Sequence, residues 1–367
     1  MRIARLSMRN FRSYAAADVE LGPGVTVVTG RNGAGKTNLL DALYFGCTGR
    51  SARTANEREL VRFGEQVVRV EVTTEAPDGL HELSVGFTPG EPKRMTADGV
   101  RVERLLDVPG RPLVSVFLPD RLELVKGTPS LRRAHMDQLV AGLWPARAAT
   151  RRAYNQALAQ RNALVARIRG AGTSLDSLSA WDRELARHGI ALMADRAAAV
   201  ELVRERFAAR AEELGLDGGA AVAYRPRSRA ADADALAAEL SDRRARDVER
   251  GFTGHGPHRD DLVLTHEGRE LRAYGSQGQQ RLGLLALLLA EREAIAATRE
   301  ATPVMLLDDV MSELDRDRRA RLVGLLRDRG QSVITTTDLD HVPGGEEADV
   351  TRLSVADGAV HVEAQAA

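Results

Sequence analysis

The chain has 367 residues, of which 43% are hydrophobic and 28% charged, a composition typical of folded globular proteins and not of disordered or fibrous ones. Basic and acidic residues balance at 52 each, and no apolar run approaches the ~20 residues that a membrane span needs. Neither a membrane anchor nor a secretory signal is expected, and the single cysteine, Cys47, excludes an internal disulfide. We therefore expect a cytoplasmic protein of two or three compact units.

The segment 1–120 is predicted to be rich in β-structure, because short apolar and β-branched runs alternate there with Gly and Pro. Strands are expected at 3–8, 19–21, 25–29, 67–73, 81–87 and 114–117.

From Ser130 the apolar residues take a helical period, interrupted at Pro145 and again by a turn at 170–174. The two long helical stretches on either side of this turn are expected to pair antiparallel, as an arm of at most ~60 Å. Beyond residue 250, strands and helices alternate again. This pattern predicts a strand at 261–265, a helix at 277–298, a strand at 304–308, a helix at 315–329 and a strand at 333–337. The expected segments are 1–120, 121–250 and 251–367.

Charge is unevenly distributed along the arm segment. Between Arg121 and Gly170 there are ten basic residues and two acidic ones. The surplus predicts a surface for a polyanion such as nucleic acid, and the alternative is an ordinary solvated helix face.

A phosphate-binding loop follows the strand at 25–29 and opens a helix. The match to G-x-x-x-x-G-K-[ST] consists of Gly30, Arg31, Asn32, Gly33, Ala34, Gly35, Lys36 and Thr37. Glycines let backbone N–H groups turn toward a phosphate at the helix N-terminus. Lys36 is expected to reach the β- and γ-phosphates of ATP, and the Thr37 hydroxyl to bind Mg²⁺.

Two adjacent carboxylates end the apolar strand at 304–307. Asp308 is expected to bind Mg²⁺ through water, and Asp309 to orient the attacking water. The alternative is that Asp308 and Asp309 only form a turn after the strand. The phosphate-binding loop upstream favours the metal-binding interpretation.

A third motif begins the most apolar helix of the chain. Ser276 and Gln279 fit an S-x-x-Q capping box, which is a purely structural explanation for both. It does not explain Gly278, which is costly in a first helical turn and permits close approach of another group. A helix N-terminus with a serine hydroxyl can receive a γ-phosphate. Because the phosphate loop already has its own helix, we expect this one to serve the nucleotide of a second copy, in an ATP-bridged dimer.

These motifs, with two further segments, carry a family resemblance. The segments are 10–14 (NFRSY), 30–40, 256–261 (GPHRDD), 276–281 (SQGQQR) and 306–315 (LLDDVMSELD). Together they resemble the RecF family of bacterial recombination mediators, ABC-type ATPases related to the SMC proteins. The resemblance implies an α/β fold, in which an ABC-type P-loop ATPase head is built as two lobes from the chain's ends and a helical arm is inserted between them.

Residue roles follow from the same resemblance. The loop 30–37 is similar to Walker A, and Asp308 to the Walker B aspartate. Asp309 stands where the catalytic glutamate is usual, and its shorter side chain suggests slow hydrolysis. Ser276, Gly278 and Gln279 lie in the segment that resembles the signature motif.

Three positions have less defined roles in that resemblance. Arg12 matches a basic residue that lies near the nucleotide. The segment 312–315 matches a loop that crosses the dimer interface. Asp315 also fits a helix N-cap. The usual switch histidine is replaced by 335–338, where Thr337 and Asp338 are the candidates for a γ-phosphate sensor. There is no glutamine between Val114 and Val125 for a Q-loop.

The resemblance implies a function in DNA replication, repair and the SOS response. It implies an ATP-dependent homodimer with weak DNA-dependent ATPase activity. The dimer is expected to bind double-stranded DNA, and gapped or damaged DNA at single-strand/double-strand junctions, and to help load the recombinase. The implied partners are RecR and RecO. The alternative is an ATPase subunit of a transport or protein-remodelling machine, whose signature would normally carry two adjacent glycines. By residue type alone, the turn at 258–261 is an ordinary loop before a strand, and Cys47 is core filler.

Overall fold

The computed structural model describes residues 1–171 and 174–363, and the chain divides into two compact units. The first unit combines Met1–Arg121 with Ile295–Ala367, and the second is Leu122–Ala294. Because the second unit is inserted into the first, both ends of the chain contribute to one unit.

This division groups residues 251–294 with the inserted unit, whereas the sequence analysis grouped them with the C-terminal lobe. The reason is local packing: the strand at Asp261–His266 pairs with Ala220–Arg225 of the insertion. The division into three segments stays a prediction.

An antiparallel sheet forms one layer of the first unit, in the order β2-β1-β4-β5-β6-β7. Val70 and Val72 are buried on one face while their neighbours point away, as strand periodicity requires. A Cβ atom added at Gly46 would lie 2.4 Å from the Val72 side chain, so helix α1 (Lys36–Thr48) packs closely on β4. The strands are β1 Arg2–Phe11, β2 Tyr14–Glu20, β4 Val68–Ala76, β5 Gly79–Phe87, β6 Arg94–Ala97 and β7 Val100–Val102.

A second, mostly parallel sheet has the order β15-β14-β3-β13-β12-β8. Strands β12 and β13 are fully buried, as strands covered on both faces must be, and β12 is wholly apolar. Strands β3, β13 and β12 run parallel, so their carboxyl ends meet at one edge of the sheet. The strands are β3 Val25–Thr29, β8 Val114–Phe117, β12 Val304–Leu307, β13 Ser332–Thr336, β14 Thr351–Ala356 and β15 Ala359–Val362.

The remaining elements of the first unit are helix α10 (Arg316–Arg327) and short 3₁₀ turns. Cys47 lies in the core with no exposed surface, as expected of a filler residue. The turns are η1 Glu57–Leu60, η2 Leu105–Asp107, η3 Pro119–Leu122, η7 Val310–Glu313 and η8 Leu339–His341.

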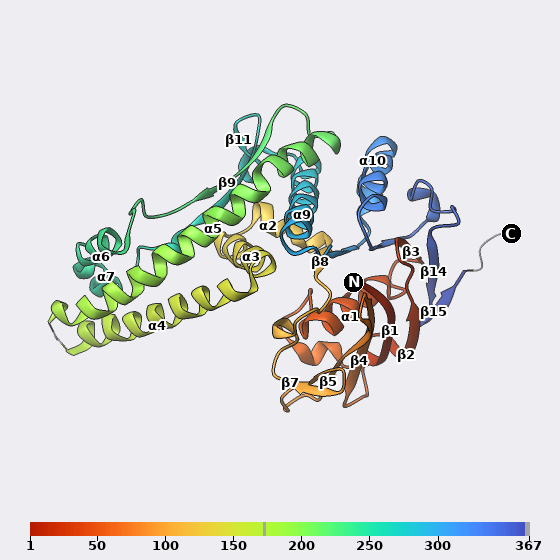
Figure 1. Ribbon diagram of the computed structural model, residues 1–367, viewed down its shortest axis with the longest axis horizontal. Helices are drawn as coiled ribbons and strands as arrows, with labels where there is room; N and C mark the ends of the chain where they lie inside the picture. The colour runs from red at the N-terminus through yellow and green to blue at the C-terminus, as the bar shows by residue number, and fades with distance from the viewer. Residues whose placement is uncertain (172–173, 364–367) are drawn as a thin grey trace. The chain divides into compact units, whose positions relative to one another are not determined.

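The second unit contains the predicted arm, formed by α4 (Ala148–Ala171) and α5 (Ser179–Glu213), which lie side by side in Figure 1. Arg161 pairs with Asp182 at 2.7 Å, and a Cβ atom added at Gly189 would lie 3.4 Å from the Tyr154 ring. As the residue number falls on α4 it rises on α5, so the helices are antiparallel, as predicted. The 35 residues of α5 span about 50 Å. Of the expected turn at 170–174, residues 172–173 lie outside the described part.

A small antiparallel sheet, β11-β10-β9, and shorter helices complete the second unit. Helix α9 (Gln277–Arg299) begins in this unit, and its last residues belong to the first. The others are α2 Glu123–Lys126, α3 Pro129–Leu143, η4 Pro145–Arg147, η5 Leu175–Leu178, β9 Ala220–Arg225, α6 Ala233–Ser241, α7 Arg244–Arg250, η6 Pro257–Arg259, β10 Asp261–His266, β11 Arg269–Glu270 and α8 Leu271–Tyr274.

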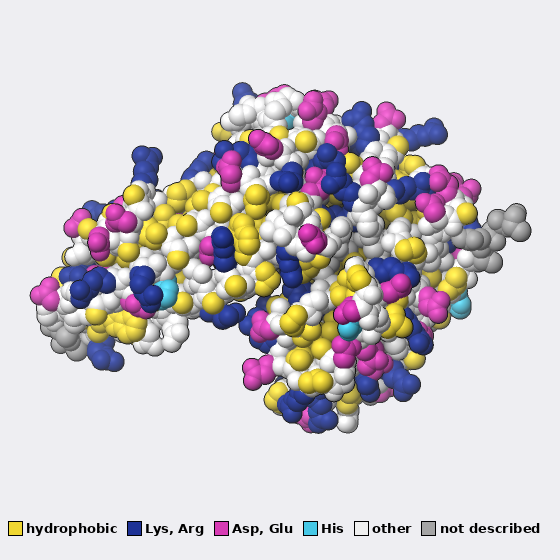
Figure 2. All heavy atoms as spheres, viewed as in Figure 1, with side chains coloured by type: hydrophobic (Ala, Val, Ile, Leu, Met, Phe, Trp, Pro, Cys, Tyr) yellow, Lys and Arg dark blue, Asp and Glu magenta, His cyan; other side chains and the backbone are white. Residues whose placement is uncertain are grey.

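Charged side chains of both signs are interspersed over the visible face of the molecule (Figure 2). In the described residues, no helix combines the length and apolar character needed to cross a bilayer.

Candidate functional site

The loop between β3 and α1 takes a backbone path that requires glycine. Gly30, Gly33 and Gly35 have φ values of 154°, 81° and 119°, which L side chains rarely adopt. A Cβ atom at Gly35 would also lie 2.9 Å from the Tyr14 hydroxyl oxygen. No side chain caps the N-terminus of α1, so its first N–H groups are suited to an anion.

Lys36 folds back over this loop. Its Nζ donates to the carbonyl oxygens of Gly30 at 2.6 Å and Arg31 at 3.1 Å. Burial lowers the pKa of the Lys36 ammonium, and the carboxylates of Asp309 and Asp308 oppose that shift. The ammonium is therefore held within the loop and in the field of both acids.

Asp308 is the centre of a hydrogen-bonded group at the end of β12. The Thr37 hydroxyl lies 3.0 and 2.9 Å from its two carboxylate oxygens, and the Thr335 hydroxyl donates to Oδ1 at 2.7 Å. Burial raises the pKa of Asp308, while the two threonine hydroxyls counteract this by stabilising the carboxylate. The structure thus brings Thr37 and Asp308 together, as the sequence analysis expected.

Asp309 adopts a left-handed conformation with φ 47°. Its backbone N–H donates to the Thr335 hydroxyl at 3.0 Å, and Ser312 Oγ donates to its carbonyl oxygen at 2.8 Å. Its Oδ1 is buried and has no hydrogen-bond partner among the described residues. A buried carboxylate oxygen without a partner is a group to which a water or ligand can bind.

The donor set fits Mg²⁺ held jointly with a nucleotide. Magnesium is usually bound through one or two carboxylates, with waters and substrate phosphates completing its octahedron. Thr37 and Asp308 supply a hydroxyl and a carboxylate at one point. Over residues 1–171 and 174–363, no cluster of three His, Cys, Asp or Glu side chains forms an all-protein metal site.

Thr335 is a member of this group that the sequence analysis did not single out. Parallel pairing places Ile334 opposite Leu307, so the residues that follow each, Thr335 and Asp308, are also neighbours. The sequence places both residues at the carboxyl end of a predicted strand, but the register that brings them together is set by the tertiary fold. The two residues proposed as sensors, Thr337 and Asp338, are exposed, and Asp338 caps η8 by accepting from the Asp340 N–H at 3.0 Å.

Arg12 has a structural partner in α1. Its Nη2 lies 2.8 Å from Asp41 Oδ2, and Ser51 and the N–H of Ala52 also donate to that carboxylate. Arg12 therefore ties β1 to α1 and the turn after it. Of the remaining loop residues, Arg31, Asn32 and Gly33 are exposed, and Ala34 is half-buried.

The residues of the third motif lie in the second unit. The Ser276 N–H donates to Gln279 Oε1 at 2.8 Å, and the Gln279 N–H donates to Ser276 Oγ at 3.2 Å, which is the reciprocal capping box. Gly278 is exposed, and a Cβ atom added there would meet only Ser276 Oγ, at 3.9 Å. Packing within the chain therefore gives no reason for a glycine at this position.

Asp315 caps helix α10, because its side chain accepts from the Arg318 N–H at 2.9 Å. The N-cap interpretation of this residue is confirmed. The interface role remains a prediction.

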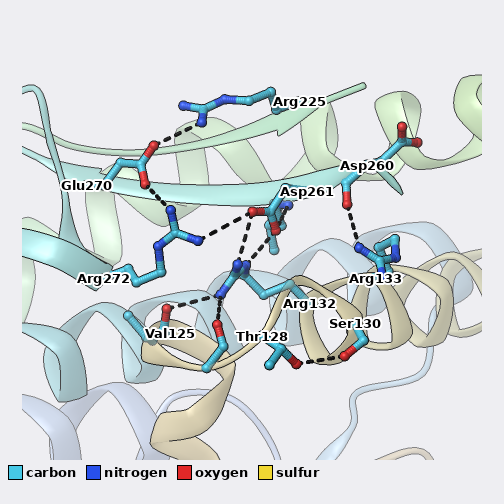
Figure 3. A network of polar contacts seen from close by, with 12 residues as sticks. Val125, Thr128, Ser130, Arg132, Arg133, Arg225, Asp260, Asp261, Glu270 and Arg272 are labelled. Carbon is cyan, nitrogen blue, oxygen red and sulfur yellow. Dashed lines mark hydrogen bonds and ion pairs between the residues drawn. The ribbon is translucent and has the colours of Figure 1, made fainter. Parts of the chain in front are cut away.

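The basic surface expected between Arg121 and Gly170 does not include two of its arginines. Arg132 and Arg161 are 2% and 0% exposed and form ion pairs inside the second unit. Figure 3 shows Arg132 between Asp261 on β10 and backbone carbonyls that include that of Val125. Buried guanidinium groups in such pairs are not available to an external anion, so the local sequence count overstated the surface charge.

The turn at 256–261 joins the helices of the arm to β10. The Tyr154 hydroxyl lies 2.7 Å from His258 Nδ1, and His258 Nε2 lies 2.9 Å from the Thr253 carbonyl oxygen. Asp260 is fully buried, and Arg196 and Tyr224 donate to it. The turn is thus a buried polar junction and not an ordinary loop.

Known proteins with similar sequences and structures were found for this chain. A family model described as an AAA domain matches residues 5–98. The DNA replication and repair protein RecF of Myxococcus xanthus is 39% identical, with 100% of this chain and 98% of the relative covered. RecF of Frankia alni is 38% identical, with 98% and 99% covered.

Solved structures agree with these relatives. A structure of the recombination mediator protein RecF with ATP, from the RecFOR pathway, has a TM-score of 0.88 at 28% identity and covers 99% of this chain and 98% of its own. An SMC head bound to the C-terminal winged-helix domain of ScpA has a TM-score of 0.60 at 17% identity, with 99% and 97% covered, and shows the fold alone. The fold is that of an ABC-type ATPase head with an inserted arm.

Proposed function

Because the chain belongs to the RecF family of DNA replication and repair proteins, we propose that it is an ATP-gated, DNA-binding homodimer of recombinational repair. It binds gapped or damaged DNA at single-strand/double-strand junctions in the cytoplasm and helps to load the recombinase. RecR and RecO are its partners, a proposal that the RecFOR pathway named for the solved relative supports.

The observation that carries this proposal is the convergence of three sequence-distant segments at one edge of the parallel sheet. The loop 30–37, Asp308 and Asp309, and Thr335 come from the ends of β3, β12 and β13, which run parallel. Ligands bind at the carboxyl ends of such strands. The named relatives replicate and repair DNA, which disfavours a transport or remodelling ATPase.

In this proposal the loop residues hold the triphosphate of ATP. Backbone N–H groups at Gly33, Gly35 and the start of α1 take the phosphate oxygens, and Lys36 exchanges its carbonyl acceptors for them. Thr37 and Asp308 hold Mg²⁺, which when bound neutralises charge on the phosphates.

The carboxylate of Asp309 orients the attacking water. Its unpartnered Oδ1 supports this role, because the oxygen is buried and its hydrogen-bonding capacity is unused. An aspartate reaches one methylene less far than a glutamate, so hydrolysis is slow and serves as a switch. This slow hydrolysis depends on DNA.

The dimer is completed by Ser276 and its neighbours from a second copy. Ser276 Oγ accepts from the Gln279 N–H, and its own proton remains available for donation to a γ-phosphate oxygen. The open space around Gly278 supports close approach from outside the chain. ATP then closes two copies over DNA, and hydrolysis releases it.

Sedimentation with ATP, ADP and no nucleotide tests the proposal. We expect the wild type to dimerise only with ATP. Lys36→Ala should not bind ATP tightly. Ser276→Arg should bind ATP normally but should not dimerise. Ser276→Asp keeps the capping acceptor but repels phosphate, so it is also expected to stay monomeric. Ser174→Arg replaces another exposed capping serine and is the matched control. Dimerisation of Ser276→Arg with ATP, or dimers of equal affinity without nucleotide, would refute the gating mechanism.

A further inference from the structure

The second unit carries a cluster of arginines around one glycine-rich loop, at 250–259. A Cβ atom added at Gly251 would lie 2.9 Å from Arg169 Nη1, and one at Gly254 would lie 3.5 Å from Arg250 Nη1. The loop is therefore lined by the last residue of α7 and by a residue near the end of α4.

Two more arginines adjoin the same loop. The Arg259 guanidinium lies 5.2 Å from the centre of the Phe252 ring, whose side chain is 42% exposed. Arg133 Nη1 donates to the backbone oxygen of Asp260 at 3.0 Å, as Figure 3 shows. We call Arg133, Arg169, Arg250 and Arg259 the loop arginines.

None of the loop arginines forms an ion pair with a carboxylate in the described part of the chain. Arg169, Arg250 and Arg259 are exposed, and Arg133 is half-buried. Other arginines of the second unit, such as Arg161, Arg196 and Arg244, do have carboxylate partners. The contrast shows that these four are not part of the ion-pair network that holds the unit together.

Two carboxylates near the loop are neutralised by buried arginines of the second unit. Asp247, which also accepts from the Gly254 N–H, pairs with buried Arg161 at 2.7 Å. Asp260 pairs with buried Arg196 at 3.1 Å. These two carboxylates therefore do not compensate the charge of the loop arginines.

The close approach of like charges is visible at Arg133 and His258. The pKa of Arg133 is lowered by burial and by the neighbouring guanidinium groups of Arg196 and Arg259. The pKa of His258 is lowered by burial and by Arg259 and Arg133. Such a cluster is stabilised when an anion binds to it.

We propose that the loop arginines form a binding site for the phosphate backbone of DNA on the inserted unit. The inference rests on the proposed DNA-binding function and specifies which surface carries it. Guanidinium groups on three elements, α3, α4 and α7, and on the η6 turn, fit a polyphosphate chain better than a single small anion, because they surround a loop of several residues. Phe252 supports Arg259 in its exposed position.

The test measures binding of a fluorescent 30-base-pair duplex to the full chain with ATP, by anisotropy, between about 50 and 300 mM salt. The test protein carries Arg169→Gln, Arg250→Gln and Arg259→Gln. The control carries Arg94→Gln, Arg187→Gln and Arg204→Gln, which are exposed arginines with a carboxylate three residues away. Both variants change the net charge equally, and tryptophan fluorescence on denaturation verifies that each folds.

We expect the test variant to bind at least about tenfold more weakly than the wild type at 100 mM salt, with a salt slope shallower by about 1 to 3, since each duplex phosphate contact contributes about 0.9 to that slope. The control should stay within about threefold. Equal affinities and slopes for the test and control variants would overturn the inference while leaving DNA binding intact, and would assign the loop arginines to another acidic partner. A wild type that binds neither this duplex nor a gapped duplex with ATP would overturn the proposed function, and binding of the gapped duplex alone would overturn the inference.

Discussion

Thr335 is the residue whose replacement tests the geometry of the proposed ATPase site most directly. Its hydroxyl donates to Asp308 Oδ1 at 2.7 Å and accepts from the Asp309 N–H at 3.0 Å, and its side chain is fully buried. One oxygen atom thus links the metal-binding carboxylate to the strained residue that is proposed to orient water. Thr335→Val keeps the shape and removes both hydrogen bonds.

The expected loss has two parts. A buried hydrogen bond to a charged group contributes about 1.5–3 kcal/mol, and leaving the Asp309 N–H without an acceptor costs about 1–3 kcal/mol. Holding Asp309 at φ 47° costs of order 1–3 kcal/mol, which the Thr335 bond helps to offset. We expect the valine variant to be less stable by about 2.5–6 kcal/mol, and its kcat for ATP hydrolysis to fall about 10- to 100-fold.

The assay is steady-state ATP hydrolysis with DNA at a temperature where each variant is folded, together with equilibrium ATP binding. Because Lys36 and the loop glycines do not contact Thr335, the KM for ATP should change less than about threefold. Thr335→Ser restores the hydroxyl and should recover kcat. A valine variant with wild-type kcat, or a serine variant no better than valine, would show that Thr335 does not position Asp309.

Three further predictions concern single residues. Burial and neighbouring arginines lower the pKa of His258 to about 4 from its ordinary 6.5. Below pH 6.5 the unfolded chain takes up a proton at His258 that the folded chain does not. The contribution of His258 to stability is therefore complete above pH 6.5 and is lost as the pH falls from 6.5 toward 4. Denaturant unfolding followed through Trp144 and Trp181, both in the second unit, should show a loss of up to about 3 kcal/mol over that range, reduced in His258→Gln; parallel pH profiles would contradict this. Burial raises the pKa of the Cys47 thiol to about 12, so a thiol reagent should react with it only after denaturation, and rapid labelling of the native protein would be inconsistent with this core. At Gly30, φ is 154° and an added Cβ atom would lie 2.6 Å from a backbone oxygen. Gly30→Ala should therefore reduce the affinity for ATP at least about tenfold. An unchanged affinity in an equilibrium titration would refute this constraint.

The local elements could be predicted because their patterns are short-range. The phosphate loop, the strand that ends at Asp308 and the antiparallel pairing of α4 and α5 all follow from spacing between neighbouring residues. Strand β9 (Ala220–Arg225) was not predicted because three of its six residues are alanines, which are uncommon in strands. Helices α6 and α7 were not predicted because charged residues interrupt their apolar periodicity.

Long-range pairing explains what the sequence could not reveal. The basic count along 121–170 takes no account of Asp261, which is distant in the chain and neutralises Arg132. Arg12 likewise acquires its partner from α1, where Asp41 is already bonded to Ser51. Charge becomes available to a ligand only after such internal partners are assigned, and these are fixed by the tertiary fold.

The same reasoning reconciles the two interpretations of Ser276. The capping box is present, but a serine that accepts from the Gln279 N–H uses only a lone pair, and its O–H remains a donor. Capping fixes the direction of the Ser276 hydroxyl at the N-terminus of α9. A phosphate-binding site requires a donor held in this way. The glycine two residues later is exposed and its surroundings are open, so this helix tip is ordered by its own chain and leaves room for the second copy of the proposed dimer.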